Sequence, residues 1–256
     1  MRRKPVHVLF VLPIFTLLFI LFSFGAISAA EKETCLKCHK KLTTGKFVHK
    51  ALDMGCTSCH TAINAKAVPH KKTNALTRGL SSEQPELCYG CHDQGIFTKK
   101  NVHPAVSMGC TGCHNPHSSK NAKLLTSKPP ALCFTCHDKA GFTRKFVHAP
   151  VASGDCMTCH SPHSTDEMAL LLNKPAVVCL QCHPDAQHGQ HSPSHQLPVS
   201  DQAEGKTLLP ELRDPSRPDK PFYCGSCHMP HSAATAPLFR FRGKSEKDFC
   251  THCHKM

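Results

Sequence analysis

The sequence predicts a mostly irregular fold, with short α-helices, many turns and little or no β-sheet. Three observations lead to this prediction. The 256 residues include 18 Cys and 21 His but no Trp and only 2 Tyr, which is abnormal for an ordinary globular domain. All 18 Cys occur in one short motif that is repeated along the chain. Between the motifs, 20 Pro and 14 Gly favour turns over long helices or strands.

Residues 1–30 have the pattern of an export signal. Residues 2–4 are basic, residues 8–24 are an almost unbroken apolar run, and residues 28–30 are small, as at a cleavage site. An uncleaved membrane anchor is the alternative, because the apolar run is long for a signal. The small-residue end favours cleavage. No second stretch is apolar enough to span a bilayer, so we expect residues 31–256 to be exported without a stable membrane span.

Every Cys belongs to a Cys-x-x-Cys-His motif, and no Cys is left over. The nine motifs are Cys35/Cys38/His39, Cys56/Cys59/His60, Cys88/Cys91/His92, Cys110/Cys113/His114, Cys133/Cys136/His137, Cys156/Cys159/His160, Cys179/Cys182/His183, Cys224/Cys227/His228 and Cys250/Cys253/His254. On one helical turn the two Cys lie on the same side, where their thiols can form thioethers to both vinyl groups of one porphyrin. The following His then lies beneath the ring and supplies the first axial nitrogen to iron. The motifs therefore predict nine covalently attached haems c.

Other uses of this many Cys do not explain the pattern. An exported chain with 18 Cys could form nine disulfides, but disulfides need no His after every second Cys. Zinc sites need four ligands per metal and no fixed trailing His. Thioredoxin-like sites use a single Cys-x-x-Cys on a βαβ background, which is absent here. All nine Cys-x-x-Cys pairs are followed directly by His, which chance placement of His does not explain.

The motifs come in pairs, so the chain is a repeat protein. Residues 88–118 and 133–164 are the clearest copies, and both end on Pro-His-Ser. We expect one nine-haem domain over residues 31–256. It is built of the doubled units 35–87, 88–132, 133–178 and 179–249, the last with an insertion at 199–221, and of a terminal half-unit at 250–256.

These doubled motifs resemble the doubled-CXXCH family of multihaem c-type cytochromes. The resemblance covers about residues 35–256, nearly all of the chain after the signal. It implies a multihaem cytochrome c fold. It also implies an electron carrier of the periplasm or outer membrane, in bacteria that respire on external or insoluble acceptors.

The remaining His residues are candidates for the second axial ligands. Four lie between the two motifs of a unit: His49, His103, His148 and His195. Three follow a proximal His in Cys-His-x-Pro-His, and one takes a matching place further downstream: His117, His163, His231 and His70. The ninth ligand would be His188 or His191, of which we assign His191. His252 lies inside its own motif and is geometrically unsuitable. A His three residues past the proximal one cannot reach the far side of the same ring, so we expect it to bind a different haem.

Only some 25 residues serve each haem, too few for a conventional core, so we expect a stack of porphyrins to form the core and the apoprotein to be unfolded. The charge agrees with this expectation. The formal charge is +13, of which the signal carries three, so residues 31–256 carry +10. Nine ferric haems bring about −9 through their propionates, which the Lys and Arg neutralise. The basic chain therefore does not indicate a nucleic-acid partner.

We expect electron transfer rather than catalysis. Six-coordinate, low-spin haems exchange electrons without binding a substrate, and closely packed haems conduct them from donor to acceptor. The expected location is the periplasm, the outer membrane or the extracellular side, in anaerobic or extracellular respiration. The expected partners are other redox proteins, with a quinol-oxidising cytochrome upstream and an outer-membrane conduit or terminal reductase downstream.

Two alternative functions remain open. A reductase of nitrogen or sulfur oxyanions needs an open iron, and several such enzymes replace the proximal His with Lys. No Cys-x-x-Cys-Lys occurs here, and the supply of His leaves no obvious vacancy. The other alternative is a polymerising or porin-embedded cytochrome, including a homo-oligomer, which the sequence does not distinguish from a single-chain carrier.

Overall fold

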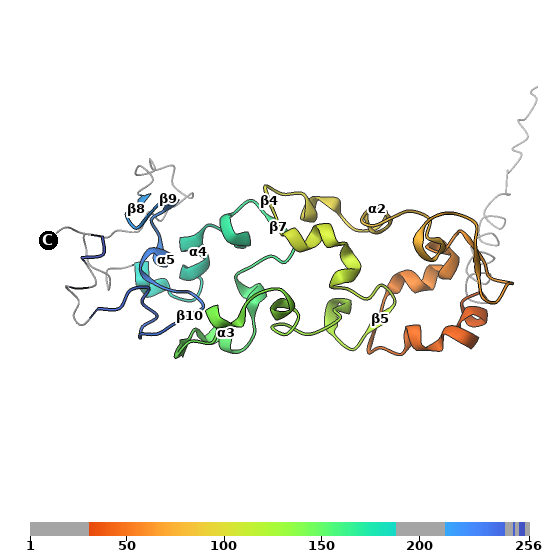
Figure 1. Ribbon diagram of the computed structural model, residues 1–256, viewed down its shortest axis with the longest axis horizontal. Coiled ribbons are helices and arrows are strands. Elements are labelled where there is room, and N and C mark those ends of the chain that lie inside the picture. Colours follow the sequence, from red (N-terminus) through yellow and green to blue (C-terminus); the bar gives the residue numbers. More distant parts are fainter. Residues whose placement is uncertain (1–30, 188–212, 244–247, 249–250, 254–256) are drawn as a thin grey trace, which may run out of the picture. The chain divides into compact units, whose positions relative to one another are not determined.

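The computed structural model describes residues 31–187, 213–243, 248 and 251–253 (Figure 1). Residues 31–39 are helical. The further α-helices are α2 (Glu86–Tyr89), α3 (Ala149–Ala152), α4 (Pro175–Leu180) and α5 (Cys224–Cys227). The 3₁₀ turns are Lys40–Thr43, Lys50–Met54, Cys56–Ser58, Thr77–Gly79, Gln94–Phe97, Pro104–Met108, Cys110–Gly112, Ala122–Leu124, Cys133–Thr135, Lys139–Gly141, Cys156–Thr158, Met168–Leu170 and Pro184–Gln187. The prediction of short helices at the motifs is confirmed.

The strands of the described residues are short and pair only two by two. They are β1 (Phe47–Val48), β2 (Ile63–Asn64), β3 (Lys71–Lys72), β4 (Asn101–Val102), β5 (Ser118–Ser119), β6 (Phe146–Val147), β7 (Ser164–Thr165), β8 (Arg213–Asp214), β9 (Arg217–Pro221) and β10 (Ser232–Ala233). All five ladders are antiparallel: β1 with β5, β2 with β3, β4 with β7, β6 with β10, and β8 with β9. The fold is irregular with little sheet, as predicted.

Three of these ladders join neighbouring repeats. We call His49, His103 and His148 the loop His, and His117, His163 and His231 the Pro-His residues. In each of the three ladders, the strand just before a loop His pairs with the strand just after the Pro-His residue of the next repeat. Val48 lies opposite Ser118, Val102 opposite Ser164 and Val147 opposite Ser232. Consecutive repeats are therefore interlocked by backbone hydrogen bonds.

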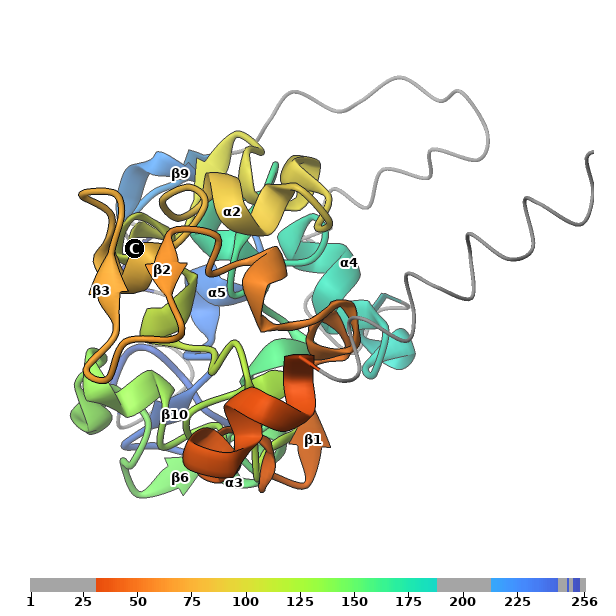
Figure 2. The ribbon, with the colours of Figure 1, turned by 90° about the vertical axis from the view of Figure 1, so that its right-hand side faces the viewer.

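The described residues form two compact units. The first contains residues 31–91 and 110–126, and the second contains residues 92–109 and the described residues from 127 onward. In the first unit, β2 and β3 run antiparallel as a hairpin, which Figure 2 shows in orange. The hairpin follows the second attachment motif, which ends at His60, and His70 lies in it just before β3.

Two glycines turn the chain into the second motif of a repeat. Gly55 has φ 91° and Gly109 has φ 88°, and each immediately precedes the first Cys of the motif. Residues with a Cβ rarely adopt this conformation, so Gly permits the sharp entry to the attachment turn at no steric cost.

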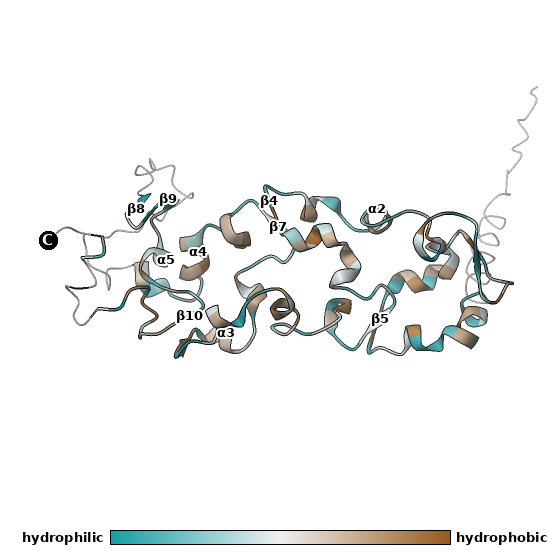
Figure 3. Cartoon of the chain, viewed as in Figure 1, coloured by the Kyte–Doolittle hydropathy of each residue, from teal (hydrophilic) through white to brown (hydrophobic). Residues whose placement is uncertain are grey.

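The described residues contain almost no hydrophobic core. The buried apolar side chains among them are Ala62, Val178, Phe222 and Ala233. Figure 3 shows hydrophobic residues in short stretches along the chain, interrupted by hydrophilic ones. The polypeptide alone thus lacks the apolar interior of an ordinary domain, as expected if bound cofactors fill it. In the described part of the chain, no helix has the length and apolarity that crossing a membrane requires. The expected signal, residues 1–30, lies outside that part.

Candidate haem-binding sites

Most of the described attachment motifs begin with a short helical turn, and the first lies at the end of a longer helix, residues 31–39. In six motifs the backbone N–H of the motif His donates to the carbonyl of the first Cys, at 3.0 Å from His60 to Cys56 and at 2.8 Å from His228 to Cys224. This hydrogen bond fixes the two Cys at positions i and i+3, on one side of the turn. The described Cys side chains are all partly or fully exposed. Each pair is therefore accessible to a porphyrin.

The second Cys of the first motif in each repeat is more exposed than its motif partner. These exposed residues are Cys38, Cys91, Cys136 and Cys182. A site closed by polypeptide would bury both of its thiols, so the described chain by itself does not enclose these four expected attachment points. These thiols are exposed because little chain is available to cover each site. A bound porphyrin would cover them. Haem attachment at these four Cys stays a prediction from the motif.

The ninth motif is described only in part. Cys253 is half-buried, whereas Cys250 and His254 lie outside the described residues. Burial, followed by the electrostatic field of Cys253, raises the pKa of the Cys227 thiol, so the ninth motif lies close to the eighth. Attachment of a haem to Cys250 and Cys253 stays a prediction, because the described residues do not include the complete turn.

Five proximal His candidates lie opposite a second His. These are pairs of imidazoles whose ring centroids are 5.8 to 6.1 Å apart. The distances are 5.8 Å for His39–His70, 6.1 Å for His60–His117, 6.1 Å for His103–His137, 6.0 Å for His148–His183 and 5.9 Å for His160–His231. Each pair joins a His of a Cys-x-x-Cys-His motif to one of the expected second ligands.

This spacing fits one iron between the two rings. Two imidazoles that bind a metal ion from opposite sides, each through a bond of about 2 Å, hold their centroids roughly 6 Å apart. The structure also places two Cys directly before one His of each pair. The residues present therefore fit a covalently attached haem with two His ligands.

The pairs follow a rule that depends on the repeat. A proximal His of a first motif faces the loop His of the preceding repeat, as His137 faces His103 and His183 faces His148. A proximal His of a second motif faces the Pro-His residue of the following repeat, as in His60–His117 and His160–His231. His39 is different, because it faces His70 of its own repeat.

Backbone carbonyls orient most of these imidazoles. Nδ1 of second-motif His residues donates to a carbonyl in the turn that follows: His60 to Arg78 at 3.0 Å, His114 to Lys123 at 2.8 Å, His160 to Ala169 at 2.9 Å and His228 to Pro237 at 3.1 Å. Nδ1 of candidate second ligands does likewise: His49 to Pro116 at 2.8 Å, His103 to Pro162 at 3.0 Å and His70 to Ala67 at 2.7 Å. A protonated Nδ1 leaves Nε2 as the metal-binding atom.

Two of the candidate second ligands have a lowered pKa. Burial, followed by the nearby His60, lowers the pKa of His117. Burial, followed by the nearby His160, lowers the pKa of His231. Both shifts favour neutral imidazole, the form that ligates iron.

The loop His and the Pro-His residue of successive repeats are bonded to each other. The N–H of His49 donates to the carbonyl of His117 at 2.8 Å. His103 and His148 repeat this contact with His163 at 2.8 Å and His231 at 3.0 Å. We call each such contact between a loop His and a Pro-His residue a junction, and it carries two candidate iron ligands. At the junction of His148 and His231, these ligands face different partners, His183 and His160.

Serine residues at these junctions were missed by the sequence reasoning. Ser118, Ser164 and Ser232 follow the Pro-His residue and are buried. The Ser232 hydroxyl donates to the carbonyl of Gly141 at 2.9 Å and accepts from the N–H of Arg144 at 3.2 Å. Ser164 makes the matching bonds to Ile96 and Lys99. The recurrence of Ser after Pro-His was the sequence signal for this role.

Two Phe side chains pack against the same imidazoles. The ring of Phe97 lies 4.6 Å from that of His163, and the ring of Phe142 lies 4.6 Å from that of His231, measured between centroids. Such contacts exclude water from one side of the ligand and restrict its rotation.

Several expected site residues lie outside the described part of the chain. They are Cys250, His254, His188, His191 and His195. The structure describes His49, His92, His114, His163 and His228, and their roles as iron ligands stay predictions. His252 stacks on Phe241 at 4.3 Å and donates to the carbonyl of Asp248 at 3.0 Å.

The two attachment turns within a repeat are in contact. Thiols of the first Cys of both motifs share hydrogen bonds in the pairs Cys35–Cys56, Cys88–Cys110 and Cys179–Cys224. Before haem attachment, burial and the neighbouring Cys35 raise the pKa of the Cys56 thiol to about 11. Two porphyrins attached to these neighbouring sulfurs would have their edges close together.

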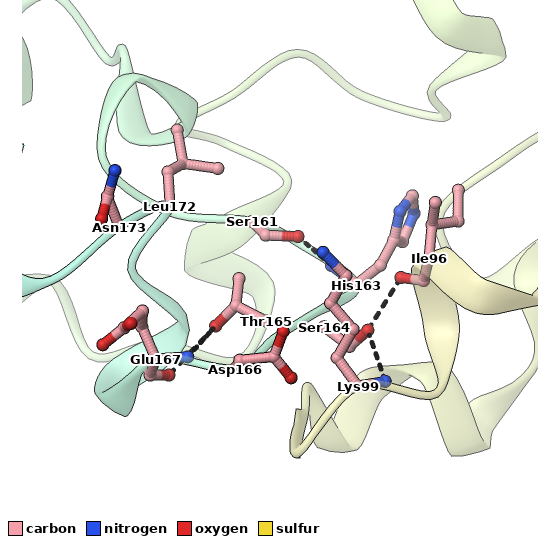
Figure 4. A pocket seen from close by; sticks show the side chains of 10 residues that line it. All are labelled: Ile96, Lys99, Ser161, His163, Ser164, Thr165, Asp166, Glu167, Leu172 and Asn173. Carbon is pink, nitrogen blue, oxygen red and sulfur yellow. Dashed lines mark hydrogen bonds between the residues drawn. The ribbon is translucent and has the colours of Figure 1, made fainter. Parts of the chain in front are cut away.

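A separate hollow of about 360 Å³ lies beside the junction at His163 (Figure 4). Its lining includes Ser164, Thr165, Asp166 and Glu167. Figure 4 shows the hydroxyls of Ser164 and Thr165 bonded to nearby backbone. No Cys lines the hollow, so it is not an attachment site.

Comparison with known proteins agrees with these sites. Residues 49–96, 103–142, 148–188 and 217–256 match the family model described as the doubled CXXCH motif. The multiheme cytochrome MtrA of Shewanella baltica (strain OS185) is 31% identical over 110 residues. The alignment covers 39% of this chain and 30% of that protein, so the chain spans less than a third of its relative.

The family match and the geometry lead to the same conclusion. The four matched segments make up well over half of the residues, and each contains Cys-x-x-Cys-His motifs with a candidate second ligand. The chain therefore belongs to the doubled-CXXCH family of multihaem c-type cytochromes.

Proposed function

We propose that this chain is an electron-transfer protein that carries nine haems c, each held by two thioethers and two axial His. The observation that carries the proposal is the set of opposed imidazole pairs, 5.8 to 6.1 Å apart, each beside a Cys pair. Each haem, when bound, supplies a one-electron ferric/ferrous couple. A site with both axial positions filled exchanges electrons without binding a substrate.

The proposed ligands follow from the geometry and the repeats. The proximal ligands are the nine motif His. His70, His117, His103, His148 and His231 are proposed as second ligands because each faces a proximal His. His49 and His163 occupy equivalent repeat positions and are proposed on that ground. His195 and His191, outside the described residues, complete the set.

Within each unit, the attachment sites follow one another in chain order. In the first unit, Cys35 contacts Cys56, and Cys88 contacts Cys110 and lies in the electrostatic field of Cys59. In the second unit, Cys159 interacts with Cys182 of the seventh motif, whose Cys179 contacts Cys224. An electron can therefore hop between consecutive haems of a unit. When haems are bound, the adjacent thiols would hold neighbouring porphyrins close, and the paired His would fill both axial positions and so exclude substrate binding at iron.

The proposed setting is export to the periplasm or the outer membrane. The signal-like residues 1–30 support export, and the similarity to a multiheme cytochrome supports a place in a respiratory electron pathway. The proposed partners are redox proteins, namely a quinol-oxidising cytochrome as donor and an outer-membrane conduit or terminal reductase as acceptor. Enzymatic reduction of an oxyanion would instead require an open iron.

Mass spectrometry and one ligand substitution test this proposal. The intact exported protein should carry nine haem masses, and fewer would contradict the count. His103→Met should convert one haem to a high-spin state or raise one reduction potential, because Met ligation raises haem potential. His252→Met is the matched control and should leave the spectrum unchanged. An unchanged spectrum in His103→Met, or binding of CO by the unsubstituted protein, would contradict the bis-His assignment.

A further inference from the structure

The eighth attachment turn is covered by a part of the chain that the other repeats lack. The hairpin of β8 and β9 ends the insertion at residues 199–221 and leads into α5, which holds Cys224 and Cys227. Figure 1 shows β8, β9 and α5 together, in blue. The inner residues of this motif, Gly225 and Ser226, are buried. In every other motif, at least one inner residue is exposed.

A fully buried carboxylate organises this hairpin. The Asp214 side chain has no exposed surface. One of its oxygens accepts from the N–H and the hydroxyl of Ser216, at 2.9 and 2.7 Å. The other accepts from Nε of Arg217 at 2.8 Å and also from its Nη2. Burial opposes ionisation of Asp214, but these hydrogen bonds outweigh it and lower its pKa to about 2.

Two guanidinium groups converge on one carbonyl of the attachment turn. Arg217 donates from Nη2 to the oxygen of Gly225 at 2.9 Å. Arg240 donates to the same oxygen from Nε at 3.1 Å and from Nη2 at 2.8 Å. The phenol ring of Tyr223 occupies the space that a Cβ at Gly225 would need. The turn is thus fixed by Asp214, Arg217 and Arg240, which we call the arginine brace.

The charges of the brace do not cancel. Asp214 and Arg217 form an ion pair. The brace has two guanidinium groups, Arg217 and Arg240, against the single carboxylate of Asp214, so these three side chains carry a net charge of +1. That charge contacts the residue between the two haem-bearing Cys, where the covering hairpin reduces the screening by water.

The backbone position of Arg240 recurs in other repeats with a different side chain. The N–H of Arg240 donates to the carbonyl of Cys227 at 2.8 Å. Leu172 makes the same bond to Cys159, and Thr126 to Cys113, both at 2.9 Å. The turn therefore does not need Arg for its backbone geometry, and the charge at this position is specific to the eighth site.

We propose that the arginine brace tunes the eighth site: its net positive charge, to which Arg240 contributes, raises the reduction potential of the haem attached to Cys224 and Cys227. The inference rests on the proposed electron-transfer function. Adding an electron to a haem adds negative charge, which a nearby fixed cation stabilises. The site lies next to the seventh in the array, through the contact of Cys224 with Cys179, so electrons arriving there would reside at the eighth haem.

Spectroelectrochemical titration of the holoprotein tests the proposal. Arg240→Gln should lower the reduction equilibrium constant of one haem of nine about tenfold, which is about 59 mV for a one-electron couple. Arg240→Lys keeps the positive charge, so its reduction constant should stay close to that of the unsubstituted protein. Asp214→Asn should shift the same component in the opposite direction, because Arg217 then also lacks its counter-charge. Arg242→Gln, two residues away and exposed, is the matched control and should change the constant less than twofold.

The outcomes separate this inference from the function on which it rests. Equal shifts in Arg240→Gln and Arg242→Gln, or a downward shift in Asp214→Asn, would overturn the tuning role while leaving a haem-loaded electron carrier. If Arg240→Gln does not fold, the upward shift in Asp214→Asn still decides the matter. A purified protein without haem absorption would instead overturn the proposed function itself.

Discussion

The third and fourth repeats contain the same haem-attachment turn in two different environments. Behind both second motifs, the His backbone forms an isolated β-bridge, His160 with Leu171 and His228 with Phe239. Both imidazoles donate from Nδ1 to a carbonyl of the following turn, at 2.9 and 3.1 Å. The backbone of the site is therefore a property of the repeat.

The surroundings of the two turns differ completely. In the third repeat, the inner residues Met157 and Thr158 are exposed, Met157 to 48%. In the fourth, Gly225 and Ser226 are buried beneath the β8–β9 hairpin. The comparison teaches that the repeat supplies the attachment turn, whereas the hairpin supplies burial and Arg240 supplies charge at the fourth repeat alone.

The strongest test of this comparison is Gly225→Ala. A Cβ at this position would collide with the Tyr223 ring, so the substitution should destabilise the braced turn by roughly 2–3 kcal/mol. Hydrogen exchange of the β9 amides measures the local free energy of opening. Gly112→Ala is the control, because a Cβ at Gly112 meets nothing within 4 Å. Equal effects of the two substitutions would show that the fourth repeat is no more constrained than the second.

Acid should weaken the brace selectively. The pKa of Asp214 is lowered from 3.8 to about 2, so its ionised form is favoured by folding. The resulting stabilisation is complete above about pH 4 and is lost as the pH falls through the folded pKa near 2. The loss is at most roughly 2 kcal/mol. Exchange of the hairpin amides, corrected for the intrinsic rate, should show it between pH 5 and 2.

Asp214→Asn is the control for the acid effect, since Asn does not titrate in this range. In this variant, the free energy of opening of the β8–β9 hairpin should be the same from pH 5 to 2. The free energy of opening at the Ser164 junction should not depend on pH in either protein. An acid loss of equal size in Asp214→Asn would assign the effect to a different carboxyl group.

The sequence was sufficient to predict the attachment turn but not the connections between repeats. The spacing of Cys56, Cys59 and His60 alone predicts the turn, because i and i+3 side chains share a face. It does not decide that His117 lies opposite His60. That pairing depends on how β5 aligns with β1, a contact between residues some seventy positions apart.

The brace was hidden for a different reason. Asp214 and Arg217 lie in a stretch that the repeat pattern identifies only as an insertion, and Arg240 is one basic residue among many. Nothing in their spacing indicates that they converge on Gly225, because the convergence requires both the hairpin and the turn that follows the motif. His39 facing His70 in its own repeat was equally unpredictable, since the β2–β3 hairpin has no counterpart in the other repeats that the structure describes.

The smallest expected effect comes from moving the charge rather than removing it. Leu172→Arg places a guanidinium at the third-repeat position equivalent to Arg240, beside a turn that no hairpin of the described residues covers. Leu172 is 53% exposed, so water should screen the new charge. We expect a stability change within about 0.5 kcal/mol. The shift in any reduction constant should be less than twofold, in the titration used for Arg240→Gln. A tenfold shift would mean that an arginine at this position suffices by itself. The hairpin would then serve the folding of the fourth repeat and not the potential of its haem.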